Sequence, residues 1–255
     1  MKKVLSFLAI AAMVLVACSK TPTPKPNPNP DPEPEPEPEP EYVMPITVDG
    51  DFADWAKLDA TKVASAKSDA ASPWDAVKEI RVYADEAYVF FYLEYDNAQI
   101  GDLLAGANGT NDEGEPLGLP IRLNLNTDGE FTTGYANYSL DAYDFIIEGS
   151  LAQDGAWKSF DGTLHQRIDG WVALQEGGLC EGAGNGNKYE IALTRDMFNG
   201  AALKSDVPMP MGDEFYAGVR FYTPSWGELA NMPDGPVTDD NAKGWGHLLK
   251  VTTVK

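Results

Sequence analysis

Short runs in which apolar and polar residues alternate recur from Tyr42 to Lys255, and they restrict the fold more than any other feature of the chain. The clearest are 80–84 and 88–96, which only the three residues 85–87 separate. Alternation with a period of two is typical of strands that bury one face. The same pattern predicts strands at 121–125, 144–150, 163–169, 171–175, 188–193, 214–223 and 246–254.

Turn and helix signals agree with this pattern. Asp154-Gly155 and Asp169-Gly170 have the residue types of tight hairpin turns. Helical turns are expected only near 51–58, 100–104 and 194–198, and strands do not alternate with helices. We therefore predict an all-β fold, an antiparallel jelly-roll or immunoglobulin-like β-sandwich with a few short helical turns.

The glycine-rich segment 182–186 superficially resembles a phosphate-binding loop. It lacks lysine and precedes a predicted strand, whereas phosphate loops lead into a helix. We predict a flexible loop between strands instead.

The N-terminal residues have the pattern of an export signal. Lys2 and Lys3 precede an apolar run that is too short to span a membrane, so residues 1–17 are predicted to be a signal peptide. The tetrapeptide Leu15-Val16-Ala17-Cys18 resembles the lipobox of bacterial lipoproteins, which implies lipidation of Cys18. A chance cysteine after an ordinary signal is the alternative. The resemblance implies an extracytoplasmic protein that meets the outer membrane through its lipid anchor alone, on either the surface or the periplasmic side.

A proline-rich stalk is predicted at residues 18–41. Every even-numbered residue from Pro22 to Pro40 is proline, and such a segment forms neither helix nor sheet. In polyproline II conformation, at about 3.1 Å per residue, the proline-alternating residues 22–40 would extend roughly 60 Å. The β-sandwich is therefore predicted to occupy residues 42–255.

Acidity is concentrated in that sandwich. The chain has a formal net charge of −21, and residues 42–255 contain 34 acidic and 15 basic side chains, a net charge of −19. A nucleic-acid partner is excluded on this ground, because binding to phosphate backbones depends on Lys and Arg. Neutral sugars or bound calcium suit such a surface better. Cys180 lies apart from basic residues and His, so we expect an unreactive side chain.

Several short landmarks resemble a known family. Val48-Asp49-Gly50 is followed by Asp54-Trp55, and the Asp85 hairpin, the segment 119–134, the strand 144–149 and the strand 188–193 come next in order. Together they resemble family 9 carbohydrate-binding modules. The resemblance implies a jelly-roll sandwich, commonly calcium-stabilised, that binds polysaccharide. Fold carries over from such a likeness better than the ligand does.

Sugar binding requires flat aromatic faces and fixed polar donors, because pyranose rings expose C–H patches and hydroxyls. Trp74 and Trp226 lie in turn-rich segments, where each is either a sugar platform or a plug that anchors its loop. Trp171 is predicted to face away from its apolar neighbours. Trp55 and Trp245 are expected in the core, and Trp157 is left open.

Three arginines occupy predicted outer strand faces. Arg81, Arg122 and Arg220 alternate with the apolar residues of their strands, and Tyr222 shares the face of Arg220. Either they form a ligand surface or they neutralise neighbouring acids. Our hypothesis is that Trp74 or Trp226 stacks on a sugar while one of these arginines donates hydrogen bonds to it.

Calcium is the predicted ion. Asp128 and Asp144 match landmarks of the family and offer the hard oxygen ligands that calcium prefers. The acidic segment 234–240 is a second possibility, and solvated turn aspartates are the alternative throughout. The residues from Asp49 onward do not form an EF-hand, since position six is Asp54 instead of glycine.

Two functions remain open at this point. The first is a non-catalytic lipoprotein that captures neutral poly- or oligosaccharide, with proteins of a glycan-uptake system as possible partners. The second is a structural lipoprotein that uses the same sandwich to dock a protein. An enzyme is disfavoured, because no nucleophile or zinc motif occurs. Glu148 is the best candidate for a catalytic acid, but a solvated or calcium-facing carboxylate is the preferred interpretation. Exposed aromatic rings would favour the first function, and a flat apolar patch the second.

Overall fold

The computed structural model describes residues 41–68, 75–130, 143–166, 171–173, 178–199, 211–233 and 248–255. The chain divides into a unit Met1–Tyr42 and a compact unit Val43–Lys255, and the fold below is that of the second unit. The predicted signal, Cys18 and almost the whole stalk lie outside the described residues. In the part of the chain that is described, no helix is both long and apolar enough to cross a bilayer.

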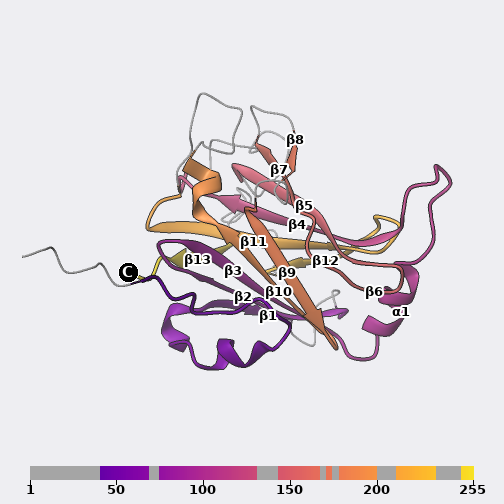
Figure 1. The fold of residues 1–255 in the computed structure, drawn as a ribbon, viewed down its shortest axis with the longest axis horizontal. Coiled ribbons are helices and arrows are strands. Elements are labelled where there is room, and N and C mark those ends of the chain that lie inside the picture. The colour runs from indigo at the N-terminus through magenta and orange to yellow at the C-terminus, as the bar shows by residue number, and fades with distance from the viewer. Residues whose placement is uncertain are drawn as a thin grey trace, which may run out of the picture. The chain divides into compact units, whose positions relative to one another are not determined.

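Two antiparallel sheets form the fold, which confirms the predicted all-β sandwich (Figure 1). The five-stranded sheet has the order β1 (Ala64–Lys67), β2 (Val77–Ala84), β3 (Tyr88–Tyr95), β10 (Lys188–Thr194), β9 (Cys180–Asn185). The eight-stranded sheet has the order β12 (Glu228–Met232), β11 (Glu214–Tyr222), β4 (Gly118–Asn126), β5 (Phe145–Gln153), β7 (Thr163–Gln166), β8 (Trp171–Ala173). β13 (Leu249–Thr252) also pairs with β11, and β6 (Ala156–Trp157) with β5.

The main core lies between the inner faces of the two sheets. In the central strands β2, β3, β4 and β11, alternate residues point inward, as the period-two pattern predicts, and they are fully buried. Representative members are Ile80 and Val82 of β2, Phe91 and Leu93 of β3, Ile121 and Leu123 of β4, and Val219 and Phe221 of β11.

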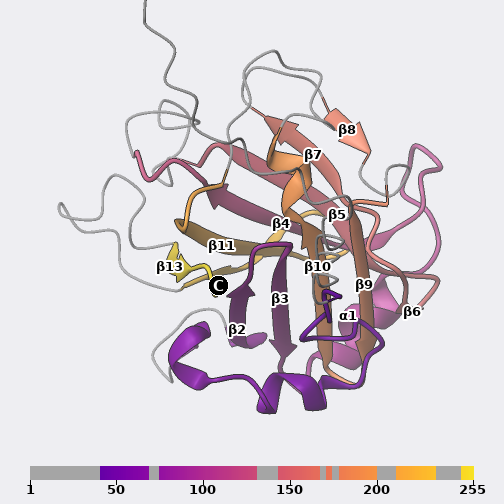
Figure 2. The ribbon, with the colours of Figure 1, turned by 60° about the vertical axis from the view of Figure 1, so that its left-hand side comes forward.

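A second apolar cluster lies on the outer face of the five-stranded sheet, where the N-terminal segment 43–63 covers it (Figure 2). Ile46 and Trp55 pack there against Tyr83, Phe90 and Tyr92. The segment contains the 3-10 helices η1 (Phe52–Ala56) and η2 (Ala60–Lys62), each capped by an aspartate that precedes it. The expected burial of Trp55 is confirmed, because 4% of its surface is exposed.

Glu190 of β10 holds this segment to the sheet. Its Oε1 accepts hydrogen bonds from the backbone N–H groups of Asp49 (3.0 Å) and Gly50 (2.9 Å). Its Oε2 accepts one from the Trp55 indole N–H (3.1 Å). Burial raises the pKa of Glu190, although these three donors oppose the shift. The landmarks Asp49-Gly50 and Trp55 therefore converge on one buried carboxylate.

The predicted turns and short helices are present where the structure describes them. Asp154 and Gly155 have φ values of 54° and 78° and join β5 to β6, as expected for a tight hairpin turn. Helical turns occur at α1 (Ile100–Gly106) and η4 (Arg195–Asn199), close to the predicted positions. The Asp169-Gly170 turn lies outside the described residues.

The prediction of a loop at 182–186 was wrong, because β9 extends through residue 185 and pairs with β10. Aromatic packing explains the glycines. A Cβ atom on Gly182 would lie 2.7 Å from Phe160 Cβ, and one on Gly184 would lie 2.5 Å from Tyr189 Cδ2. The glycines make room for aromatic rings instead of providing loop flexibility.

Candidate functional site

Four of the predicted sugar-binding residues gather on the outer face of the eight-stranded sheet. Arg122 of β4 lies directly opposite Arg220 of β11, and on its other side it lies opposite Glu148 of β5. Tyr222 is two residues beyond Arg220 on the same face, and Trp226 follows in the turn to β12. Because cross-strand neighbours share a face, these side chains form one cluster.

Trp226 is the exposed member of this cluster. Half of its surface (50%) is exposed, and its ring lies 5.4 Å from that of Tyr222. Its φ of 64° lies in the left-handed region, which is unfavourable for a bulky residue. The turn holds this conformation through Thr223, whose carbonyl accepts from the Trp226 N–H (2.8 Å) and whose Oγ1 accepts from the Gly227 N–H (2.9 Å). Strained and exposed residues of this kind concentrate at functional sites.

Arg122 is fixed beneath the aromatic rings. Its Nε donates to Glu148 Oε2, and its guanidinium carbon lies 5.4 Å and 5.8 Å from the ring centroids of Tyr222 and Trp226. Burial by itself lowers the pKa of Arg122, but Glu148 more than offsets this and the pKa is raised. The guanidinium therefore stays charged, and no hydrogen bond from its terminal nitrogens to another described residue is found.

A surface hollow of about 320 Å³ adjoins this cluster, and we call it the trough. It lies over β4, β5 and β7, and Trp226 forms part of its wall. Its volume is at the small end of the roughly 300–1,000 Å³ typical of ligand sites. The residues that define it here are Gly118, Pro120, Glu148, Ser150, Thr163 and Trp226.

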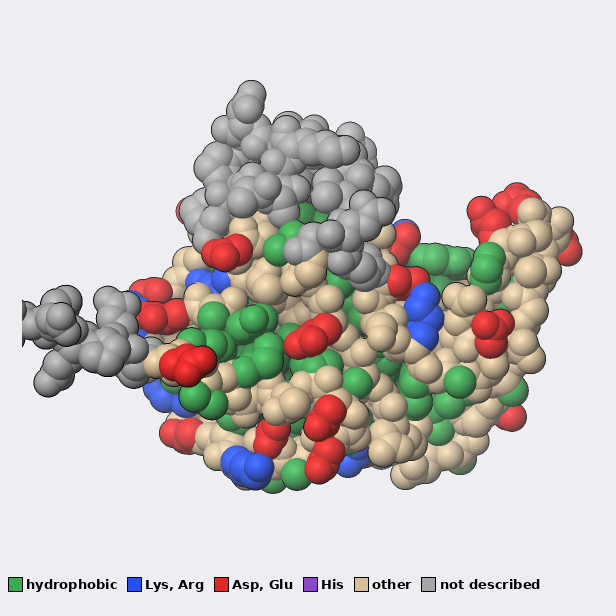
Figure 3. Space-filling view, viewed as in Figure 1, with side chains coloured by type: hydrophobic (Ala, Val, Ile, Leu, Met, Phe, Trp, Pro, Cys, Tyr) green, Lys and Arg blue, Asp and Glu red, His purple; other side chains and the backbone are tan. Residues whose placement is uncertain are grey.

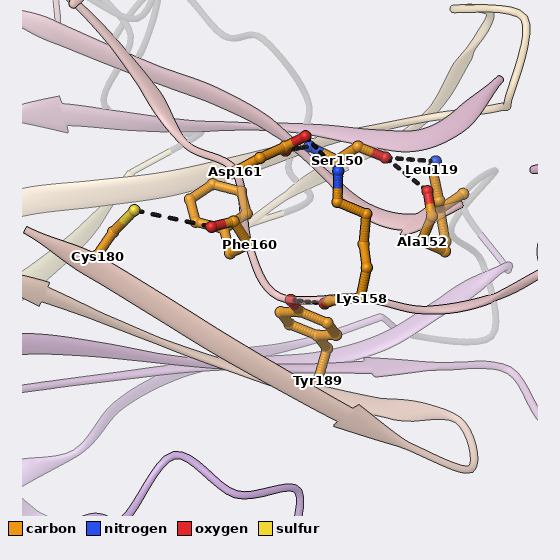
Figure 4. Close-up of polar contacts among 8 residues, drawn as sticks. All are labelled: Leu119, Ser150, Ala152, Lys158, Phe160, Asp161, Cys180 and Tyr189. Atoms are coloured by element: carbon orange, nitrogen blue, oxygen red, sulfur yellow. Dashed lines mark hydrogen bonds and ion pairs between the residues drawn. The ribbon is translucent and has the colours of Figure 1, made fainter. Parts of the chain in front are cut away.

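Ser150 and Asp161 shape one side of the trough (Figure 4). Ser150 Oγ donates to the Ala152 carbonyl (2.8 Å) and accepts from the Leu119 N–H (2.9 Å). Asp161 Oδ1 accepts from the Ser150 N–H (2.6 Å), and its Oδ2 pairs with Lys158 Nζ. With its own hydroxyl bonds satisfied by the backbone, Ser150 fixes the irregular β4–β5 pairing and is not placed as a nucleophile.

Charges around the trough occur in pairs. Arg122 pairs with Glu148, and Lys158 with Asp161, so the four ionised groups cancel locally. On the face seen in Figure 3, basic side chains likewise lie next to acidic ones. The trough thus offers hydrogen-bonding groups and an aromatic ring without a local excess of charge, a setting that suits an uncharged polar ligand.

The other predicted sugar-binding residues lie elsewhere. Arg81 is on the outer face of the five-stranded sheet, where it makes two 2.9 Å hydrogen bonds to Glu79 and lies 4.6 Å from the Tyr92 ring centroid. It is therefore not a neighbour of Arg122. Trp74 lies outside the described residues, and only the backbone of Trp171 is described, in β8.

Several contributors were not among the predicted binding residues. Glu148 was considered as a catalytic acid, whereas the structure pairs it with Arg122. No sequence motif marks the trough residues Lys158, Asp161 and Thr163, although Thr163 begins a predicted strand. Outward parity is the signal that could have marked Glu148 as a residue of this face, whereas its pairing with Arg122 depends on the strand register.

The structure also describes the surroundings of Trp157, which was left open, and of Cys180, which was expected to be unreactive. Trp157 packs between the sheets, 5.3 Å from the Tyr189 ring, and its indole N–H donates to the Gly186 carbonyl (3.1 Å). These contacts anchor Trp157 to the sandwich. Burial raises the pKa of Cys180 to about 11, so this thiol is protonated at neutral pH, in line with its expected lack of reactivity.

The predicted calcium residues lie together at the end of β4. Asp144 is fully buried, and its Oδ2 accepts from the Thr127 N–H (2.7 Å) and the Asp128 N–H (3.4 Å). Its Oδ1 is buried without a hydrogen-bond partner among the described residues. That oxygen and the nearby carboxylate of Asp128 would suit a cation, but calcium takes six to eight oxygen ligands. No group of three acidic, His or Cys side chains occurs in the described ranges, so calcium stays a prediction.

Asp144 should make stability depend on pH. Burial, to which the charge of Asp128 adds, raises its pKa to about 6, compared with about 3.9 in an unfolded chain. The folded state then holds an extra proton between pH 4 and 6, and stability should fall by up to about 3 kcal/mol as pH rises through this window. Urea unfolding at pH 4 and at pH 6 should show this loss of stability, and Asp144→Asn should reduce the difference between the two pH values.

Added calcium that binds to Asp144 should raise the melting temperature at pH 7 but not at pH 4. A melting temperature that calcium does not change at pH 7 would contradict the predicted calcium site.

Comparisons with known proteins give no assignment. No protein-family model matches the chain, and no curated protein matches it significantly. The fold and the candidate site thus define the class at this level: an antiparallel β-sandwich with an aromatic, charge-balanced trough on one outer sheet face.

Proposed function

We propose that this chain is a membrane-anchored, non-catalytic lipoprotein whose trough binds a neutral poly- or oligosaccharide. The observation that carries the proposal is Trp226: a half-exposed indole in a left-handed backbone conformation, tilted at 48° to the ring of Tyr222 and beside Arg122. An aromatic face next to a fixed guanidinium matches the C–H patches and hydroxyls of a pyranose ring. Lipid anchoring at Cys18 and stabilisation by calcium belong to the same proposal.

The surface supports a sugar ligand over a docked protein. In the described part of the chain, the large apolar side chains that are exposed are Tyr42, Val43 and Trp226. The first two are adjacent to the stalk, and Trp226 belongs to the trough. A protein-docking face would require a larger continuous apolar surface.

A pair of substitutions at Trp226 tests this function. Trp226→Gly should lower the affinity for a glycan found on an array by at least about tenfold, because the stacking ring is lost. The fold should survive, since glycine releases the left-handed strain of about 1–2 kcal/mol and this offsets the lost contact with Tyr222. Trp226→Phe, which retains a ring, is the matched control and should keep most of the affinity.

The readouts are calorimetric titration with the glycan and the melting temperature of each variant. Unchanged affinity in Trp226→Gly, with an unchanged melting temperature, would reject the trough as the sugar site. Absence of binding to every glycan on the array would reject the function itself.

A further inference from the structure

We infer that the site takes an internal stretch of a neutral glycan chain, with sugar units on both sides of Trp226, and not a chain end. This inference rests on the proposed function and specifies its ligand. It follows from a second hollow, of about 330 Å³, which we call the side hollow. The side hollow lies between the segment 111–117 and the turn residues 224–226.

The trough and the side hollow are neighbours. They share Pro116, Leu117, Gly118 and Trp226 as lining residues. Trp226 therefore borders both hollows, and half of its surface is exposed. Neither hollow is an enclosed cavity. A site that recognises a chain end needs a wall where the chain stops, whereas two adjoining open hollows allow the chain to continue past the ring in both directions.

The charged residues around both hollows favour an uncharged ligand. Around the trough, Glu148 and Asp161 are both paired with basic side chains. The side hollow is lined by Asp112 and Glu115 and by no Lys or Arg. A glycan with carboxylate or sulfate groups would be repelled there, while an uncharged chain could use Asn111, Ser225 and the acidic oxygens as hydrogen-bonding groups. The ligand class is thus an internal stretch of neutral polysaccharide.

The test uses linear neutral oligosaccharides of two to six units, prepared from cellulose, xylan, mannan and starch. Each is titrated calorimetrically in its native form and with its reducing end reduced to the alditol. Affinity for the preferred series should rise about tenfold or more between two and five units. Reduction should change the affinity of the longest member less than twofold, because the terminal ring lies outside the site.

A blocking variant locates the extra units. Thr163 lines the trough from the outer face of β7, and β4 and β5 separate β7 from β11, the strand that leads to Trp226. Aromatic residues are favourable in strands. Thr163→Phe should remove the gain in affinity with length while its melting temperature stays near that of the parent. Retention of the full gain in the folded variant would contradict the inference.

Two further outcomes separate this inference from the function on which it rests. Binding that depends on Trp226 but does not increase beyond two units, or that is lost on reduction, overturns the internal-chain inference and leaves sugar binding intact. Absence of binding by every oligosaccharide overturns both.

Discussion

Replacing Glu190 with alanine should lower the free energy of unfolding by about 3–5 kcal/mol. The carboxylate is fully buried and accepts from the N–H groups of Asp49, Gly50 and Trp55. Its removal leaves three donors without an acceptor beneath the N-terminal segment, and each unsatisfied buried donor costs about 1–3 kcal/mol. Urea unfolding and the near-ultraviolet dichroism of Trp55 would measure the loss.

Two variants calibrate that result. Glu190→Gln keeps one carbonyl acceptor but turns its amide donor toward the remaining N–H, so an intermediate loss is expected. Glu181→Gln changes an exposed carboxylate on neighbouring β9 and should leave stability within about 0.5 kcal/mol. A Glu190→Ala protein that unfolds at the parental urea concentration would show that the N-terminal segment is held by its apolar contacts alone.

Gly184→Ala should destabilise the domain by about 2–4 kcal/mol, even though it adds a single methyl group. The new Cβ atom would lie 2.5 Å from Tyr189 Cδ2 and 2.7 Å from Trp157 Cγ. Both rings are held in place, since the Tyr189 hydroxyl donates to the Lys158 carbonyl (2.5 Å) and Trp157 Nε1 donates to the Gly186 carbonyl. The rings cannot move aside without breaking these bonds, so melting temperature should fall by several degrees.

The opposite result is expected at Gly101. It lies in α1 with an ordinary φ, and a Cβ atom added to it would have no neighbouring atom within 4 Å. Gly101→Ala should therefore stabilise the domain by about 0.5–1 kcal/mol through helix propensity. If Gly184→Ala and Gly101→Ala shift the melting temperature equally, steric crowding does not explain why position 184 is glycine.

The strand pattern predicted most of the fold because burial of one strand face leaves a direct record in the sequence. The run 188–193 alternates cleanly and matches β10, and the run 88–96, which is apolar on both faces, matches β3. The pattern missed β1, β6, β9 and β12. In β9 the reason is clear: glycines that make room for aromatic rings stand where side chains would have produced alternation. Local pattern therefore failed where the structure depends on contacts between distant residues.

The candidate site was predictable only in part for the same reason. Outward parity identified Arg122, Arg220 and Tyr222, and turn chemistry identified Trp226 as a candidate for exposure. Parity could not distinguish the outer faces of two different sheets, so it grouped Arg81 with residues on the other side of the sandwich. The pairing of Arg122 with Glu148 depends on strand register, which single strands do not specify.

The clamp at Glu190 also decides how the domain would respond to being pulled. A load applied through Tyr42 would enter the sandwich at Val43 and pass first to the segment bound by Glu190. Three hydrogen bonds join Glu190 to that segment, whereas β10 is paired along both edges, so we expect the segment to detach before the central strands separate. The trough is built on the other sheet, so this first rupture would leave the strands that form the trough in place.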